Sequence, residues 1–169
     1  LTMTERMFVK IAALPSLRLT VEAHGLMAKK ALGQNFLLDQ NITDKIINLS
    51  LQKQNKKDFS GANVFEVGPG PGGLTRAVLA AEPKSLTVVE MDERCIAIMN
   101  EIKEKTGDIL HIINGDAMQT DFSDLAPAPR HIVSNLPYNI SVPLLVGWLK
   151  NINAYDSLTL MFQKEVAER

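Results

Sequence analysis

The sequence has few of the residues that would assign it to a specialised class. It holds one cysteine, Cys95, which excludes an internal disulfide framework and suits a reducing compartment. Its three histidines, His24, His111 and His131, have no metal-ligand spacing, so we expect no metal site. The net charge is −1, and the excess of Asp and Glu after residue 60 excludes a general attraction of that part for polyanions.

A convincing membrane segment or signal peptide is also missing. The longest stretch without Asp, Glu, Lys or Arg, residues 131–149, contains Pro137 and Pro143, which a lone membrane-spanning helix would not favour. The apolar stretch at 11–17 is short and is broken by Pro15, which argues against a signal peptide. We therefore expect no membrane partner and a cytoplasmic location.

The composition that remains is that of one folded domain. Of the 169 residues, 46% are hydrophobic and 22% are charged. These proportions argue against disorder, and the length suits a single domain. We assign residues 29–169 to this domain and residues 1–28 to an N-terminal extension with a short helix.

Apolar strands alternate with helices along most of the chain. The apolar pattern predicts strands at 64–67, 86–90, 109–113, 131–134 and 157–162. Helical periodicity predicts helices at 17–24, 41–51, 74–81, 92–105 and 141–150, the last of them capped by Ser141. Residues 1–14 show no clear period and are expected to be a loose end. Strands separated by helices imply an α/β fold, in which a mostly parallel sheet carries helices on both faces.

Glycines or polar residues come directly after four different predicted strands. These positions are 68–73, Glu90, Asp116 and Asn135. In parallel sheets, ligands bind outside the carboxyl ends of the strands, at the point where the strand order reverses. We therefore expect these four segments to meet in one site.

The first of these segments matches a nucleotide-binding pattern. Gly68, Gly70 and Gly73 give G-x-G-x-x-G between a strand and a helix, and Glu90 ends the next strand, where it would accept both hydroxyls of a ribose. A nicotinamide-dependent dehydrogenase and a tight turn without a ligand both remain open from this pattern. Asp116 would bond an adenine amine or would act only as a turn or cap residue.

The segment Asn135, Leu136, Pro137 and Tyr138 suits methyl transfer to the exocyclic amine of a base. An Asn oxygen and the carbonyl of Leu136 can accept the two N–H bonds of that amine, which favours an available lone pair on its nitrogen. Pro137 stiffens the turn, and Tyr138 offers a ring for a flipped base. The catalytic contributions are positioning and electrostatic complementarity. A strand-terminating turn without chemistry is the alternative.

Six segments in a fixed order resemble a known family. They are 32–37 (LGQNFL), 66–70 (EVGPG), 89–90 (VE), 115–117 (GDA), 135–141 (NLPYNIS) and 163–169 (QKEVAER). Together they resemble the rRNA adenine N6,N6-dimethyltransferases, most closely the bacterial small-subunit enzymes of the KsgA type. The resemblance extends from residue 14 to residue 169.

The resemblance implies a Rossmann-like class I methyltransferase fold and S-adenosylmethionine as the methyl donor, with S-adenosylhomocysteine as product. Such enzymes methylate two adjacent adenosines near the 3′ end of small-subunit rRNA, in an assembling ribosomal subunit. We expect a monomer. Members of the family continue with further strands and a helical C-terminal domain, which this sequence does not contain.

The resemblance also implies which residues hold the donor. Gly68 and Gly70 would lie beside its methionine part, and Glu90 would hold the ribose hydroxyls. Asn35 and Leu37 would close over the donor from the N-terminal side.

The remaining roles concern the adenine of the donor and the target base. Met91 would pack near the donor adenine, and Asp116 would bond its amine, with Ala117 beside it. Asn135 would serve both donor and target amine, together with Leu136, Pro137 and Tyr138 as catalytic segment. A dehydrogenase would leave this last segment unexplained, whereas a noncatalytic RNA-binding or assembly factor that kept the fold would share it.

Overall fold

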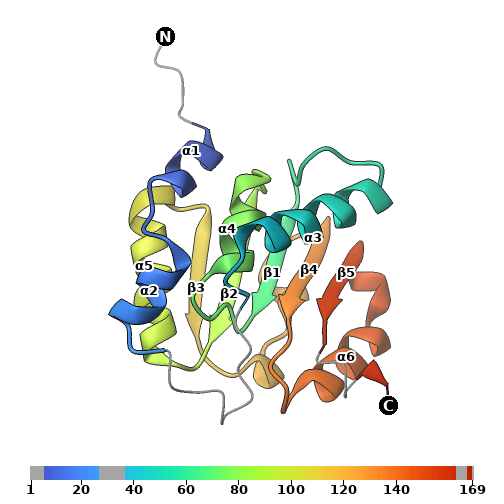
Figure 1. Ribbon diagram of the computed structural model, residues 1–169. Coiled ribbons are helices and arrows are strands. Elements are labelled where there is room, and N and C mark those ends of the chain that lie inside the picture. Colours follow the sequence, from blue (N-terminus) through green and yellow to red (C-terminus); the bar gives the residue numbers. More distant parts are fainter. Residues whose placement is uncertain (1–5, 27–36, 163–166, 169) are drawn as a thin grey trace.

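The computed structural model describes residues 6–26, 37–162 and 167–168. Its centre is a five-stranded sheet with the order β3-β2-β1-β4-β5, in which every neighbouring pair is parallel. Figure 1 shows the strands running in one direction. The strands are β1 (Asn63–Val67), β2 (Ser85–Glu90), β3 (Leu110–Asn114), β4 (Arg130–Asn135) and β5 (Ser157–Met161). The predicted α/β sheet is confirmed, and its strands end within a few residues of the predicted positions.

Within residues 6–26 and 37–162, six α-helices accompany these strands. They are α1 (Met7–Ala12), α2 (Leu17–Ala23), α3 (Gln40–Lys53), α4 (Gly73–Ala80), α5 (Glu93–Thr106) and α6 (Ser141–Lys150), with short 3₁₀ turns at Ala117–Gln119, Phe122–Asp124 and Ile152–Ala154. None of the helices within the described ranges is long and apolar enough to cross a membrane.

Helices cover both faces of the sheet. Successive strand residues point to opposite faces, so neighbouring residues of one strand pack in different clusters. Val64 belongs to a hydrophobic cluster that also contains residues of α2, α3, α4 and α5. Its neighbour Phe65 belongs to a second cluster, which contains Leu144 and Trp148 of α6. Every residue of β1 is buried, as expected for the central strand of such a sheet.

Two local predictions are wrong. Residues 1–14 were expected to be loose; residues 1–5 lie outside the described residues, but Met7 and Ile11 of α1 pack against the first cluster. Ser141 was expected to cap α6, but the N-cap position is Ile140, and the hydroxyl of Ser141 instead donates to the carbonyl of Tyr138 at 3.2 Å. The packing of α1 depends on residues far apart in the sequence, whereas the Ser141 bond is local and joins residues three positions apart.

The strand order reverses between β1 and β4. From β1 the chain proceeds outward to β2 and β3, and it then returns to place β4 and β5 on the other side. We call the end at which the strands begin, with Asn63 and Ser85, the amino edge, and the end at which they finish, with Glu90 and Asn135, the carboxyl edge. A parallel sheet opens a crevice at its carboxyl edge where the order reverses, so the fold places its crevice between the ends of β1 and β4.

Candidate functional site

The loop after β1 has a conformation that only glycine adopts readily. Gly68, Gly70 and Gly72 have φ values of +65°, +55° and +94°, in the left-handed region that disfavours L side chains. Pro69 and Pro71 alternate with them and fix the backbone between them. Gly72 occupies the N-cap of α4 and has no side chain with which to cap the N–H groups that begin this helix.

This loop lies against the turn that follows β4. A methyl group added at Gly68 would come within 2.9 Å of Cγ of Pro137. Such a contact is too short for any real side chain, so the close approach requires a glycine at position 68. The glycine loop and the Asn135-Leu136-Pro137-Tyr138 turn, predicted separately from the sequence, are therefore neighbours.

A hollow opens between the two segments. The hollow is partly open, and it contains about 280 Å³ of space not occupied by atoms, which includes open solvent. Its lining comprises Leu37, Glu66, Gly68, Pro69, Pro71, Gly73, Leu74 and Asn135. Three of the predicted site residues, Leu37, Gly68 and Asn135, thus come together from three separate parts of the chain. Asn35, predicted beside Leu37, lies outside the described residues.

Leu37 reaches the hollow because the chain leading into α3 docks on the start of α4. A side chain at Gly73 would collide with the backbone oxygen of Leu37. The side-chain amide of Gln40 donates to the carbonyl of Gly73 at 3.2 Å. These contacts fix Leu37 at the glycine loop.

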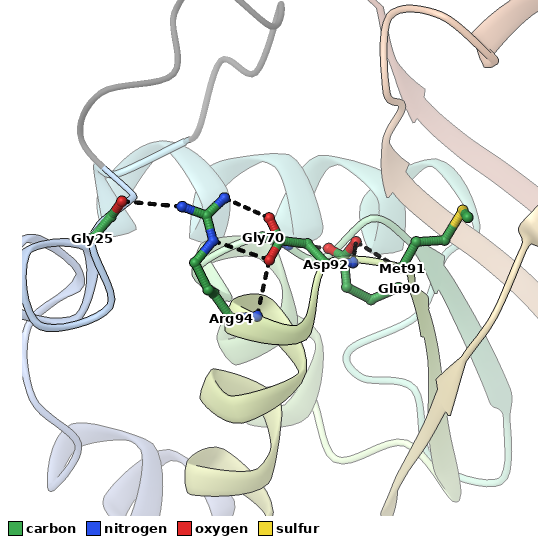
Figure 2. A network of polar contacts seen from close by, with 6 residues as sticks. All are labelled: Gly25, Gly70, Glu90, Met91, Asp92 and Arg94. Carbon is green, nitrogen blue, oxygen red and sulfur yellow. Dashed lines mark hydrogen bonds and ion pairs between the residues drawn. The ribbon is translucent and has the colours of Figure 1, made fainter.

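Glu90 is held in place by backbone N–H groups (Figure 2). Its Oε2 accepts hydrogen bonds from the amides of Met91 at 2.9 Å and Asp92 at 3.2 Å. Its Oε1 accepts from the amide of Gly70 at 3.4 Å, a long bond that connects the end of β2 to the glycine loop. The Glu90 carboxylate is therefore oriented toward the glycine loop, with which it forms the nucleotide-binding pattern in the sequence.

An ion pair between Arg94 and Asp92 extends this network to the N-terminal helices. The guanidinium of Arg94 bonds both carboxylate oxygens of Asp92, with Nη2 to Oδ2 at 2.7 Å and Nε to Oδ1 at 3.1 Å. Its Nη1 donates to the carbonyl of Gly25 at 3.2 Å, just after α2 (Figure 2). Asp92 also caps α5 by accepting from the amide of Arg94.

The residues predicted around the donor adenine follow the ends of β2 and β3 and are not part of the lining of the hollow. Met91 is 68% exposed at the carboxyl edge. Asp116 accepts from the amide of Met118 at 2.9 Å and caps a 3₁₀ turn, as its cap interpretation expects. Ala117 is 7% exposed and belongs to the second hydrophobic cluster.

In the turn after β4, Leu136 is buried and Tyr138 is exposed. Leu136 buries its side chain in the second cluster, and its amide donates to the carbonyl of Met161 at 3.1 Å. The ring of Tyr138 is 47% exposed at the same turn. An exposed aromatic ring next to the hollow suits stacking with a planar ligand.

Glu66 is a residue that the sequence prediction did not assign to the site. It is fully buried, lines the hollow, and accepts a hydrogen bond from Oγ1 of Thr75 at 2.5 Å. Burial raises the pKa of this carboxyl to about 8, with a further increase from the charge of Glu90 and a decrease from the Thr75 bond. The shift favours the neutral form of this carboxyl. A lone acid within an apolar strand, two positions before the first glycine of the loop, is the signal that could have identified it.

No group of three His, Cys, Asp or Glu side chains within the described ranges is placed to hold a metal ion.

The family comparison matches most of the chain. The model for the family described as ribosomal RNA adenine dimethylase matches residues 25–169. A relative named ribosomal RNA small subunit methyltransferase A, from Gluconobacter oxydans, is 51% identical over 157 residues, which are 93% of this chain and 50% of that protein. A relative of the same name from Allorhizobium ampelinum is also 51% identical, over 92% of this chain and 56% of that protein. The chain therefore spans about half the length of these relatives.

Solved structures show the same fold at low sequence identity. A Pyrococcus horikoshii protein, solved as a candidate RNA methyltransferase, has a TM-score of 0.65 at 18% identity and covers 99% of this chain and 76% of its own. A Podospora anserina methyltransferase with bound S-adenosylhomocysteine has a TM-score of 0.55 at 17% identity, over 89% of this chain and 66% of its own. The fold is thus Rossmann-like and is shared with S-adenosylmethionine-dependent methyltransferases.

Proposed function

Because the chain belongs to the ribosomal RNA adenine dimethylase family, we propose that it forms the donor-binding part of an rRNA methyltransferase. The reaction we propose transfers methyl groups from S-adenosylmethionine to the N6 amines of two adjacent adenosines near the 3′ end of small-subunit rRNA. The substrate would be an assembling ribosomal subunit in the cytoplasm, and the enzyme would act as a monomer.

One observation supports this proposal most directly. The glycine loop and the turn after β4 approach each other so closely that Gly68 has no room for a side chain beside Pro137. Asn135 and Gly68 consequently line the same hollow. A reaction that joins a nucleoside-bound methyl group to an amine requires both binding functions at one place.

The residues present fit S-adenosylmethionine. Gly68 and Gly73 line the hollow without side chains that would fill it, and the N–H groups at the start of α4, which Gly72 cannot cap, would be available to a polar part of the donor. Glu90 is already oriented by three backbone amides, and its oxygens can still accept the two hydroxyls of a ribose. We propose that Met91, Asp116 and Ala117 surround the donor adenine.

The bound donor supplies a sulfonium methyl group, which is transferred to nitrogen and leaves S-adenosylhomocysteine. The side-chain oxygen of Asn135 and the carbonyl of Leu136 would accept the two N–H bonds of the target amine, so that its lone pair points toward that methyl group. Pro137 would fix the turn, and Tyr138 would stack on the extruded base. After transfer the nitrogen becomes strongly acidic and gives its proton to water, so no side chain needs to act as a strong base.

Two measurements on this chain test the proposal. Calorimetric titration should show binding of S-adenosylhomocysteine, and unmethylated small-subunit particles should take up labelled methyl groups from the donor. Absence of donor binding would contradict the proposed function. Donor binding without transfer, both by this chain and by a version that continues for the length of the relatives, would instead favour a noncatalytic assembly factor.

A further inference from the structure

The backbone ladder between β1 and β4 stops before either strand ends. Its last pair is Phe65 with Ile132, although β1 continues to Val67 and β4 to Asn135. On its other side, β4 stays paired with β5 as far as Asn135 and Met161. The end of β4 therefore follows β5 and separates from β1, which opens the crevice in which the site lies.

If the β1–β4 ladder continued, its next hydrogen bonds would involve the backbone groups of Val67. Bonds in a parallel ladder engage alternate residues, and the amide of Asn63 donates to the carbonyl of Pro129 toward β4. By the same alternation, the N–H and C=O of Val67 also face β4. Val67 is 2% exposed, and buried backbone groups need partners.

The side chain of Ser134 supplies both of these partners. Its hydroxyl donates to the carbonyl of Val67 at 2.7 Å and accepts from the amide of Val67 at 3.2 Å. Ser134 is 0% exposed. A single side-chain oxygen therefore replaces two backbone bonds at the position where the strands part.

We propose that Ser134 is a positioning residue for methyl transfer, whose hydroxyl sets the separation between the glycine loop and the catalytic turn. Val67 directly precedes Gly68, and Ser134 directly precedes Asn135, so the hydroxyl lies one residue away from each wall of the hollow. A backbone ladder continued to Val67 would close the crevice, and no bond at all would leave both walls free to move. The hydroxyl bond allows the opening and keeps its width fixed.

This inference rests on the proposed function, but its structural premise is testable without it. In the native chain, hydrogen exchange of the Val67 amide should be about as slow as that of Phe65, which lies within the ladder. Rapid exchange at Val67 would overturn the inference before any substitution is made. This measurement depends on neither donor binding nor activity.

The functional consequence is tested with Ser134→Ala and a matched control. Ser85→Ala removes a comparable hydroxyl bond, from Ser85 to Oδ1 of Asn63 at 2.6 Å, at the opposite end of the same sheet. We expect Ser134→Ala to speed Val67 exchange at least about tenfold and to lower kcat for methyl transfer about tenfold, since small misplacements of reacting groups are costly. The Kd for S-adenosylhomocysteine should change less than about threefold in the same variant. Ser85→Ala should leave kcat within about twofold.

Ser134→Thr keeps the hydroxyl and serves as the second variant. It should retain slow Val67 exchange and most of kcat. If native protein transfers methyl groups and Ser134→Ala matches Ser85→Ala in kcat, the positioning role is wrong while the proposed function stands. If native protein neither binds S-adenosylhomocysteine nor transfers methyl groups, the proposed function fails, and the positioning role fails with it.

Discussion

The two edges of the sheet bury an ionisable side chain in different surroundings. At the amino edge, His131 is 0% exposed, bonds Oγ of Ser157 at 2.6 Å and contacts the ring of Phe59. At the carboxyl edge, the equally buried Glu66 bonds Thr75 but also lines an open hollow. Burial shifts the pKa of both groups toward the neutral form, downward for His131 and upward for Glu66. A perturbed pKa therefore indicates burial at either edge, and only the hollow distinguishes a candidate site.

The largest contrast between the edges should come from two asparagines. Asn135→Ala at the carboxyl edge should lower methyl transfer about 100-fold or more, because it removes an acceptor for the target amine. Asn63→Ala at the amino edge removes the bond to the carbonyl of Pro127 and the acceptor for the Ser85 hydroxyl, so it should lower the melting temperature but not the transfer rate of folded protein. Labelled-methyl incorporation and thermal denaturation separate the two effects. Near-normal transfer by the Asn135 variant would disprove its assigned role.

Two glycines provide the next comparison. Gly61 has φ +78° with nothing near its missing side chain, whereas Gly68 has φ +65° and faces Pro137. Gly61→Ala should cost about 1 kcal/mol of unfolding free energy, from the left-handed backbone alone. Gly68→Ala should cost about 3 kcal/mol, because steric overlap adds to the backbone term, and it should also weaken donor binding. Denaturant unfolding and calorimetry measure both; equal losses for the two variants would show that the close approach has no energetic consequence.

The ionisable groups of the two edges should give stability profiles of opposite slope. Folded Glu66, with its pKa raised from 4.5 to about 8, binds more protons than the unfolded chain between these values. Its contribution therefore lowers stability as pH rises through that range, by at most about 1.4 kcal/mol per pH unit. His131, with its pKa lowered below 6.5, lowers stability as pH falls below that value.

Glu66→Gln isolates the carboxyl-edge contribution. Unfolding free energies measured from pH 5 to pH 8 should fall less steeply in this variant than in the native chain. Its stability should exceed that of the native chain most clearly near pH 8, where native Glu66 is partly ionised. Parallel profiles for the two proteins would mean that Glu66 does not carry a raised pKa.

The sequence could predict those parts of the molecule that depend on local pattern and on strand ends. The strands, the parallel sheet and the convergence of Gly68 with Asn135 follow from strand–helix alternation and from the geometry of parallel sheets. The packing of α1 on α4 and α5 could not be predicted, because it depends on contacts between residues far apart in the sequence. The hydroxyl bridge of Ser134 could not be predicted either, since a serine inside a short strand carries no signal of where the neighbouring ladder stops.

Within the carboxyl edge, Glu90 should matter more for the donor than its neighbours do. Glu90→Ala should weaken S-adenosylhomocysteine binding about 10- to 100-fold, because it removes a charged acceptor and a hydrogen bond to a charged group contributes roughly 1.5–3 kcal/mol. Glu93→Ala removes the same charge from an exposed position in the first turn of α5 and should change the Kd less than about twofold. Equal changes in Kd for the two variants would show that Glu90 affects binding only through its negative charge and not through a hydrogen bond to the donor.

Arg94 should give the smallest effect, because it acts on the donor only through other residues. It holds Asp92, whose amide is one of the three that orient Glu90, and it joins Gly25 to the same corner. The pair is partly exposed, and exposed pairs contribute little to stability. Arg94→Ala should therefore weaken S-adenosylhomocysteine binding about two- to threefold and leave kcat at saturating donor unchanged. Arg94→Lys cannot bond both oxygens of Asp92 in the same planar geometry. Its affinity for S-adenosylhomocysteine should therefore lie between those of the native chain and Arg94→Ala. A loss as large as that of Glu90→Ala would mean that the guanidinium contacts the donor itself.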